Sequence, residues 1–241
     1  MSSNKEESKT TVQEVTEIEK ESALASFIED PLVHTENFYE KYKKALNVAG
    51  TVLLAGVAIF AGWKYYTESQ EKEAQSQMFQ AVYYFEADSL AKALNGDGNY
   101  PGLIEIADNY GLTKSGNLAK FYVGVANLKQ GKFDEAIQYL DDFSSSDLLI
   151  QARAYSLIGD AKMELKDFES AAKYYEKAAN YKPNKEFTPG YLLKLGLAQE
   201  KSNNLEGALA TYSELVDKYP NAAANTDAKR NKGLVESALG K

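Results

Sequence analysis

Few residues in this sequence of 241 could do chemistry. It contains no cysteine and a single histidine, His34. Thiol nucleophiles, disulfides and cysteine-ligated zinc are therefore excluded, and Ser-His-Asp or histidine–metal chemistry has one histidine at most to use. We expect no catalytic residues, no metal ligands, no cofactor and no small-molecule substrate, and so we do not expect an enzyme.

Two short motifs superficially suggest ligand binding. The glycines between Gly96 and Gly102 approach a dinucleotide-binding fingerprint, but the last one is a residue too far and an expected helix, not a strand, precedes them. The acidic and serine residues over 141–147 lack the alternating ligands and closing glutamate of a calcium loop. We interpret both as helix ends and solvated loops.

The charge balance argues against nucleic acid as a partner. The chain has 27 Lys+Arg and 35 Asp+Glu, a formal net charge of −8. A phosphate backbone would be repelled by this excess of acids. Only Arg153 and Arg230 could stack on bases as guanidinium groups, and we assign the many Tyr and Phe residues to core packing.

A groove that binds another protein is expected instead, suited to an extended or helical peptide segment. Its candidate residues are Leu118, Phe121, Val125, Leu128, Arg153, Ser156, Asp160, Met163, Leu193 and Leu197. Two alternatives stay open from sequence: the groove is free for a partner, or the chain's own helix from Gln70 to Leu94 fills it.

Self-similar blocks would position these residues. Three blocks each pair a glycine with an alanine 12 residues later, and both series recur at intervals of 35 and 37 residues. The pairs are Gly124 with Ala136, Gly159 with Ala171, and Gly196 with Ala208. Small residues at these places let two antiparallel helices approach closely. The residues four and seven positions after each alanine, all large except Ala178, fall on one helical face and would pack against the next repeat.

The blocks resemble tetratricopeptide repeats, whose unit is about 34 residues long. The resemblance implies an all-α fold, a solenoid of about four helical hairpins closed by a C-terminal capping helix with a polar outer face. We place the repeats near 84–116, where the pattern is degenerate, and at 117–151, 152–188 and 189–221, with the cap at 222–240.

A single transmembrane helix is expected before the repeats. The 19 residues from Ala45 to Trp63 contain no Asp, Glu, Lys or Arg. As a helix they would extend about 28 Å, close to the ~30 Å of a hydrocarbon core. A buried core helix is the alternative, but it would keep a polar face. The stretch is long and deep in the chain for a cleaved signal peptide, so we expect an uncleaved anchor, continued as one helix to Gly96.

Flanking charges predict which way the anchor points. Lys41, Lys43 and Lys44 precede it and only Lys64 follows closely, which favours a cytoplasmic N-terminus. We therefore divide the chain into a disordered acidic cytoplasmic tail (1–34), a juxtamembrane and transmembrane helix (35–66, span 45–63), and a periplasmic repeat domain (67–241). The tail is either a leader without a role or a docking peptide.

Three aromatic residues end the span. Trp63, Tyr65 and Tyr66 would lie at the far headgroup layer, where amphipathic rings are enriched.

In the order of its parts, an acidic tail, one anchor, a linking helix and a repeat array, the chain resembles the YfgM-like family of bacterial inner-membrane tetratricopeptide proteins. The resemblance implies a non-enzymatic ancillary subunit of the Sec translocon. Such a subunit would bind SecYEG and a PpiD-type membrane-anchored chaperone on the periplasmic side of the inner membrane. The alternatives are a general envelope scaffold, in cell division or outer-membrane coordination, and an organelle import receptor.

Overall fold

The computed structural model describes residues 41–241, and its first helix, α1, has the bounds Asn4–Glu86. The expected acidic tail over 1–34 and His34 lie outside the described residues. The chain forms two units, Met1–Lys64 and Tyr65–Lys241, which are considered separately.

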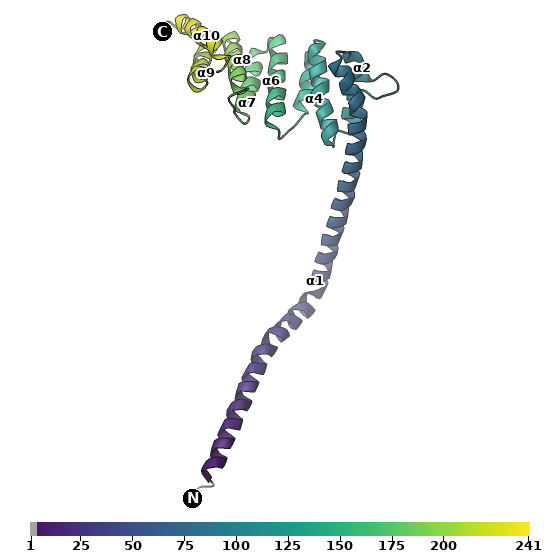
Figure 1. Ribbon diagram of the computed structural model, residues 1–241, viewed down its shortest axis with the longest axis vertical. Helices are drawn as coiled ribbons and strands as arrows, with labels where there is room; N and C mark the ends of the chain where they lie inside the picture. Colours follow the sequence, from purple (N-terminus) through teal and green to yellow (C-terminus); the bar gives the residue numbers. More distant parts are fainter. Residues whose placement is uncertain (1–3) are drawn as a thin grey trace. The chain divides into compact units, whose positions relative to one another are not determined.

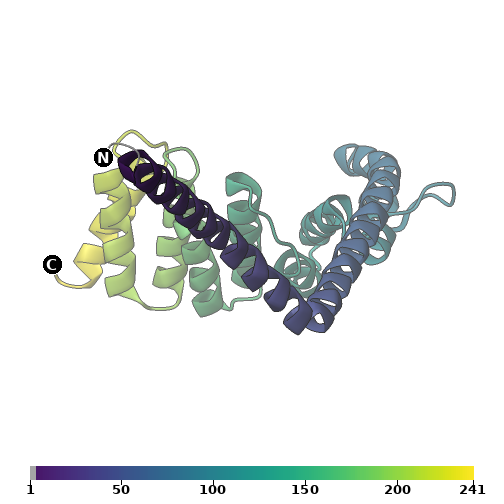
Figure 2. The ribbon, with the colours of Figure 1, turned by 90° about the horizontal axis from the view of Figure 1, so that it is seen from below.

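The second unit contains helices and no strand within the described residues (Figure 1). After α1 come α2 (Leu90–Asn95), α3 (Leu103–Asn109), α4 (Lys114–Lys129), α5 (Phe133–Asp141), α6 (Leu148–Glu164), α7 (Phe168–Asn180), α8 (Thr188–Lys201), α9 (Leu205–Lys218) and α10 (Asn225–Ala238). Figures 1 and 2 show the hairpins of this unit following one another in chain order. The predicted all-α hairpin solenoid is confirmed, with α4–α5, α6–α7 and α8–α9 as its hairpins and α10 at its end.

The expectation of one helix continuing to Gly96 is wrong. α1 ends at Glu86, and Asp88 adopts a left-handed conformation with φ of 54°. The Ser89 amide then donates a hydrogen bond to the Tyr84 carbonyl at 2.8 Å, as in a helix-ending Schellman turn. An aspartate can take this conformation without a glycine, and so no glycine or proline in the sequence marked the stop.

The glycine of each hairpin lies against a large side chain of the second helix. The pairs are Gly124 with Leu140, Gly159 with Tyr175, and Gly196 with Tyr212. A Cβ added at Gly159 would lie 2.6 Å from Cε1 of Tyr175, closer than real contacts allow. The large residue therefore packs within its own hairpin as well as in the cluster that Tyr175 shares with Leu192 and Leu195 of the next repeat.

The turn inside each hairpin is also repeated. It places one residue in the left-handed region, at Gly131 (φ 74°), Lys166 (φ 61°) and Asn203 (φ 61°). The following amide closes the turn on a carbonyl five residues back: Lys132 on Asn127 at 2.9 Å, Asp167 on Lys162 at 2.9 Å, and Asn204 on Gln199 at 2.8 Å. The three hairpins thus share one backbone design, although a glycine occupies only the first turn.

The C-terminal part of α1 serves as the first helix of the opening repeat. Met78 and Ala81 are buried in a cluster with residues of α2, α3 and α4. The Phe85 ring meets the Tyr122 ring edge-on, with centroids 5.1 Å apart. Figure 1 places this part of the second unit at the opposite end of the row from α10, so α1 does not fill a groove along α6 and α8.

Glu71 joins α1 to the start of α4. The Ser115 amide donates to its Oε2 at 3.0 Å and the Ser115 hydroxyl donates to its Oε1 at 2.8 Å. Burial alone would raise the pKa of Glu71, but these hydrogen bonds together hold the pKa below its ordinary value of 4.5.

The packing around the glycines predicts that replacement by alanine has opposite effects on stability at two of them. Gly159→Ala should lower the free energy of unfolding by about 1–3 kcal/mol, because its methyl group must displace a buried ring. Gly233→Ala in α10, where no atom lies within 4 Å of an added Cβ, should raise it by roughly 0.5–1 kcal/mol through helix propensity. Urea unfolding of the full chain in detergent, followed by circular dichroism, compares the two. Equal effects would contradict the close packing.

The hydrogen bonds that the Glu71 carboxylate accepts from Ser115 predict that the stability of the first turn of α4 depends on pH. Because the folded pKa of Glu71 is depressed, its contribution is present above pH 4.5 and is lost as pH falls through the folded pKa. At neutral pH, Glu71→Gln should speed hydrogen exchange in the first turn of α4, measured by mass spectrometry and corrected for intrinsic rates. Glu73→Gln, at an exposed position whose carboxylate pairs with Gln77 of the same helix at 2.8 Å, is the control. Identical exchange in both variants would refute the role of Glu71.

Candidate protein-binding site

The first helices of the hairpins, α4, α6 and α8, carry all ten predicted groove residues. Two of them, Arg153 and Leu197, are exposed. Ser156 is buried, and the remaining seven are partly buried. The predicted groove residues therefore do not form a continuous exposed apolar surface, because exposed and buried positions alternate among them.

Several of the apolar candidates contribute to cores. Leu118 packs against the cluster shared by α1–α4, whereas Phe121 and Leu128 pack against the cluster between α5 and α6. Met163 and Leu193 adjoin the C-terminal cluster. Their role in partner binding stays a prediction, because each can offer a partner only the part of its surface that remains accessible.

The structure brings Ser156 and Asp160 of α6 together with Lys194 of α8. Lys194 Nζ lies 2.8 Å from Oδ1 and 2.9 Å from Oδ2 of Asp160, and it donates a longer bond to Ser156 Oγ at 3.3 Å. This ion pair crosses from one repeat to the next. Both side chains remain partly accessible, and so the pair contributes only modestly to stability.

Tyr175 of α7 joins this group, and we call Ser156, Asp160, Lys194 and Tyr175 the polar centre. Its hydroxyl donates to Asp160 Oδ1 at 2.8 Å, and its ring lies 5.7 Å from Lys194 Nζ. Burial, followed by the negative charge of Asp160, raises the pKa of Tyr175 far above its ordinary value. The phenol therefore stays protonated and acts as a fixed donor.

Arg153 and Tyr191 flank the same centre. Burial raises the pKa of Tyr191, the nearby Arg153 charge opposes this, and Asp160 adds to it. Arg153 and Asp160 thus both act on the pKa of Tyr191. The faces of α6 and α8 at this centre offer an exposed guanidinium, an ion-paired carboxylate and the partly exposed ring of Tyr191. This set suits hydrogen bonding and stacking to a peptide.

Sequence reasoning missed Lys194, Tyr175 and Tyr191. The available signal was the separation of 34 residues between Asp160 and Lys194, three fewer than between Gly159 and Gly196, which puts Lys194 about one helical turn before the position equivalent to Asp160. Opposite charges on equivalent faces of successive helices would be adjacent in such a solenoid. The search for apolar groove residues passed over this pair.

The cluster has no arrangement suited to catalysis. Asp160 is engaged by an ammonium group and a phenol, and so it is not poised as a general base. Over residues 41–241, no group of three or more His, Cys, Asp or Glu side chains could hold a metal ion.

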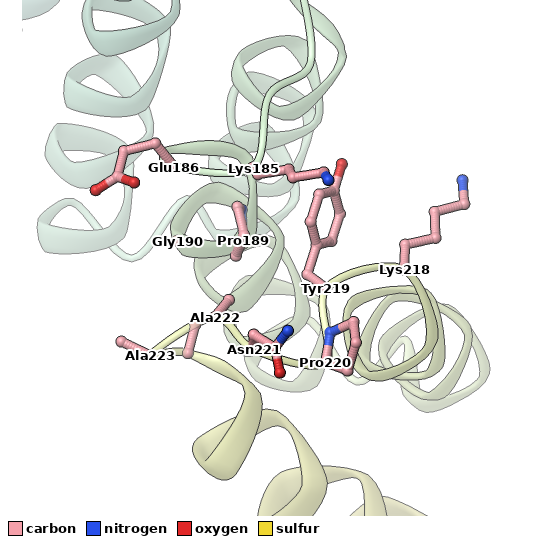
Figure 3. Close-up of a pocket in the computed structure, with 11 residues that line it drawn as sticks. Lys185, Glu186, Pro189, Gly190, Lys218, Tyr219, Pro220, Asn221, Ala222 and Ala223 are labelled. Atoms are coloured by element: carbon pink, nitrogen blue, oxygen red, sulfur yellow. The ribbon is translucent and has the colours of Figure 1, made fainter.

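A separate pocket of about 600 Å³ lies between the start of α8 and the connection from α9 to α10 (Figure 3). Pro189, Pro220 and the alanines at 222–224 form much of its wall, and Lys185 and Lys218 also line it. It lies at the ends of helices and does not include the polar centre on α6 and α8.

Comparisons with known proteins agree with this architecture. A tetratricopeptide repeat model matches residues 124–189 and 156–223, and a model described as a tetratricopeptide repeat-like domain matches residues 36–148. No curated protein matches the sequence.

Among solved structures, the fold is similar to the nearly identical TPR-like repeats of a putative kinesin light chain from Podosopora anserina. That crystal structure aligns with 12% identity and a TM-score of 0.54, over 70% of this chain and 88% of that one. A second crystal structure, of a variant of the same repeats, aligns over the same shares with 13% identity and a TM-score of 0.54. At this identity the likeness concerns the fold alone. The two repeat models together span residues 36–223, and this part of the chain therefore consists of tetratricopeptide-type repeats.

Proposed function

We propose that this protein is a membrane-anchored, non-enzymatic scaffold whose repeats bind partner proteins at the periplasmic side of the Sec translocon. Tetratricopeptide repeats are protein-interaction modules, and no catalytic family matches the chain. The finer assignment, SecYEG together with a PpiD-type chaperone in a bacterial inner membrane, follows from the resemblance in the order of its parts.

One observation carries the anchoring: the apolar part of α1 is not buried by protein. Within Lys41–Glu86 lies a stretch with mean hydropathy 1.9, none of it buried. Leu53, Leu54 and Ile59 are 67%, 68% and 73% exposed. A water-soluble monomer rarely leaves such a continuous apolar surface uncovered, whereas a bilayer would cover it on every side.

The match of one repeat-like model supports a link between anchor and repeats. That model begins at residue 36, includes the whole predicted span and continues through the α4–α5 hairpin to residue 148. Because one model matches the predicted span together with the repeats, the span fits an integral part of the protein better than an appended leader. The lysines at 41, 43 and 44 support a cytoplasmic start, and so the repeats would lie on the far side.

The scaffold would act by raising local concentration. A tethered array keeps its binding surface near the membrane, so a partner engaged there meets emerging chains at high effective concentration. The polar centre of Asp160 and Lys194, flanked by Arg153, is the part of the array that we assign to partner contact.

The anchoring can be tested directly. Washing membranes with alkaline carbonate should leave the protein in the membrane pellet. Carbonate releases proteins that are held by ionic contacts, whereas an inserted helix is not held by such contacts. In intact cells made permeable only at the outer membrane, a membrane-impermeant maleimide should label Tyr100→Cys but should label Ser26→Cys only after lysis. Release by carbonate, or the reverse labelling pattern, would contradict the anchor or its orientation.

Partner binding can be tested by charge reversal. The tagged protein, purified from membranes in mild detergent, should carry SecY in near-stoichiometric amount, and Arg153→Glu should reduce this recovery at least about tenfold, since a lost interfacial charge contact costs about 1.4 kcal/mol or more.

The matched control is Lys173→Glu, an equal charge change at an exposed site on the second helix α7. It should leave recovery unchanged. Absence of SecY from the wild-type purification would contradict the translocon assignment and favour a general envelope scaffold. Equal loss in both variants would contradict the assigned surface.

A further inference from the structure

One edge of the repeat array differs chemically from the other. We use the name loop edge for the connections that lead from the second helix of one repeat to the first helix of the next. These connections are residues 110–113, 142–147, 181–187 and 219–224. The loop edge is the lower side of the row in Figure 1. The opposite edge consists of the turns inside the hairpins, residues 130–132, 165–167 and 202–204.

Large apolar side chains are exposed along the loop edge. Leu112 is 76% exposed, Phe187 is 43% exposed, and Leu149 in the first turn of α6 is 43% exposed. Pro220 and Ala223 of the last connection are exposed as well. The opposite edge is mostly polar, with Leu165 as its one large exposed apolar residue within the described part of the chain.

The loop edge carries little net charge, in proportion to the rest of the chain. Its 23 residues contain two lysines and three acids, 2 − 3 = −1, about the same charge per residue as −8 over 241 residues. Asp147 accepts from the amides of Leu149 and Ile150 at 2.8 and 3.0 Å and so caps α6. An anionic or zwitterionic surface would therefore meet little repulsion here.

Hydrogen bonds tie the connection 142–147 to α4 and to the connection 181–187. The Asn117 amide group donates to the Ser144 carbonyl at 2.7 Å. From the following repeat, the Tyr181 hydroxyl donates to the Ser145 carbonyl at 2.8 Å and Lys182 Nζ donates to the Ser146 carbonyl at 2.6 Å. These two connections are thus held at a fixed level relative to each other.

The chain enters the second unit at this same edge. Tyr66 and Gln70 of α1 line a pocket of about 490 Å³ together with Tyr110 and Leu112 of the first connection. The Glu71–Ser115 bonds fix that position at the start of α4. Since Tyr66 lies three residues beyond Trp63, the end of the predicted span, a bilayer around that span would bring its headgroup layer to Leu112.

We propose that the loop edge docks on the outer headgroup surface of the bilayer that holds the anchor, with Leu112, Leu149 and Phe187 entering the interface. The inference rests on the proposed membrane span and goes beyond it, because a span alone would leave the array free to tumble. Docking holds the array lengthwise on the membrane. The apolar side chains supply the attraction, and the near-neutral connections avoid repulsion.

Site-specific depth measurements test this in the full chain. Because the sequence has no cysteine, single-cysteine variants carry a polarity-sensitive fluorophore at one site each, in phosphatidylcholine–phosphatidylglycerol vesicles with a nitroxide on the upper acyl chain. Leu149→Cys and Phe187→Cys should be quenched at least about twofold more than Leu165→Cys, because interfacial residues lie within about 5–10 Å of the acyl boundary.

Leu165→Cys is a matched control. Leu165 is also a leucine of similar exposure, 40%, and it lies at the other end of α6, about 24 Å from Leu149 along the helix. All three residues are 40–43% exposed and none belongs to a core cluster, and so their replacement removes a comparable, limited amount of packing at each site. If Phe187→Cys fails to fold by circular dichroism, Leu149→Cys carries the test.

Val57→Cys separates failure of the docking from failure of the anchor. Strong quenching at position 57, with equal weak quenching at 149, 187 and 165, would overturn the docking and leave the anchor standing. No quenching at position 57 would overturn both.

Discussion

The architecture depends on how closely the two helices of each hairpin approach. Glycine in the first helix leaves room for a large side chain of the second, and a single methyl group at Gly159 would collide with the Tyr175 ring. With the hairpin closed in this way, the outer faces of its two helices are fixed in direction, and the next hairpin can stack on them. The solenoid is thus built from short contacts within repeats, which then determine the contacts between repeats.

The same packing organises the candidate binding surface. Tyr175 covers Gly159 with its ring and donates its hydroxyl to Asp160, the residue next to that glycine. The third hairpin has a similar arrangement, in which the Tyr212 ring covers Gly196 and its hydroxyl bonds to Glu200. A buried tyrosine therefore links the core to a carboxylate on the first helix. These carboxylates are held in place by residues that the fold already needs for stability.

The two units have different relations to solvent. The apolar stretch of the first unit is fully exposed and has no core of its own, so it calls for a covering that the protein does not supply. The second unit buries alanines, leucines and tyrosines in three clusters and places its charges outside. This contrast supports an anchor joined to an interaction module. The exposed apolar side chains of the loop edge give the second unit a further candidate surface.

The sequence by itself determined the all-α class, the three regular hairpins and the candidate span. Glycine–alanine spacing, helical periodicity and an uncharged stretch are local patterns that repeat or persist over many residues. The sequence did not show that α1 ends at Glu86, because an aspartate occupies the left-handed position, which is usually occupied by glycine. Nor did it determine the pairing of Asp160 with Lys194 or of Glu71 with Ser115. Those contacts join residues 34 and 44 positions apart, and only the stacking of helices decides which side chains meet across such separations.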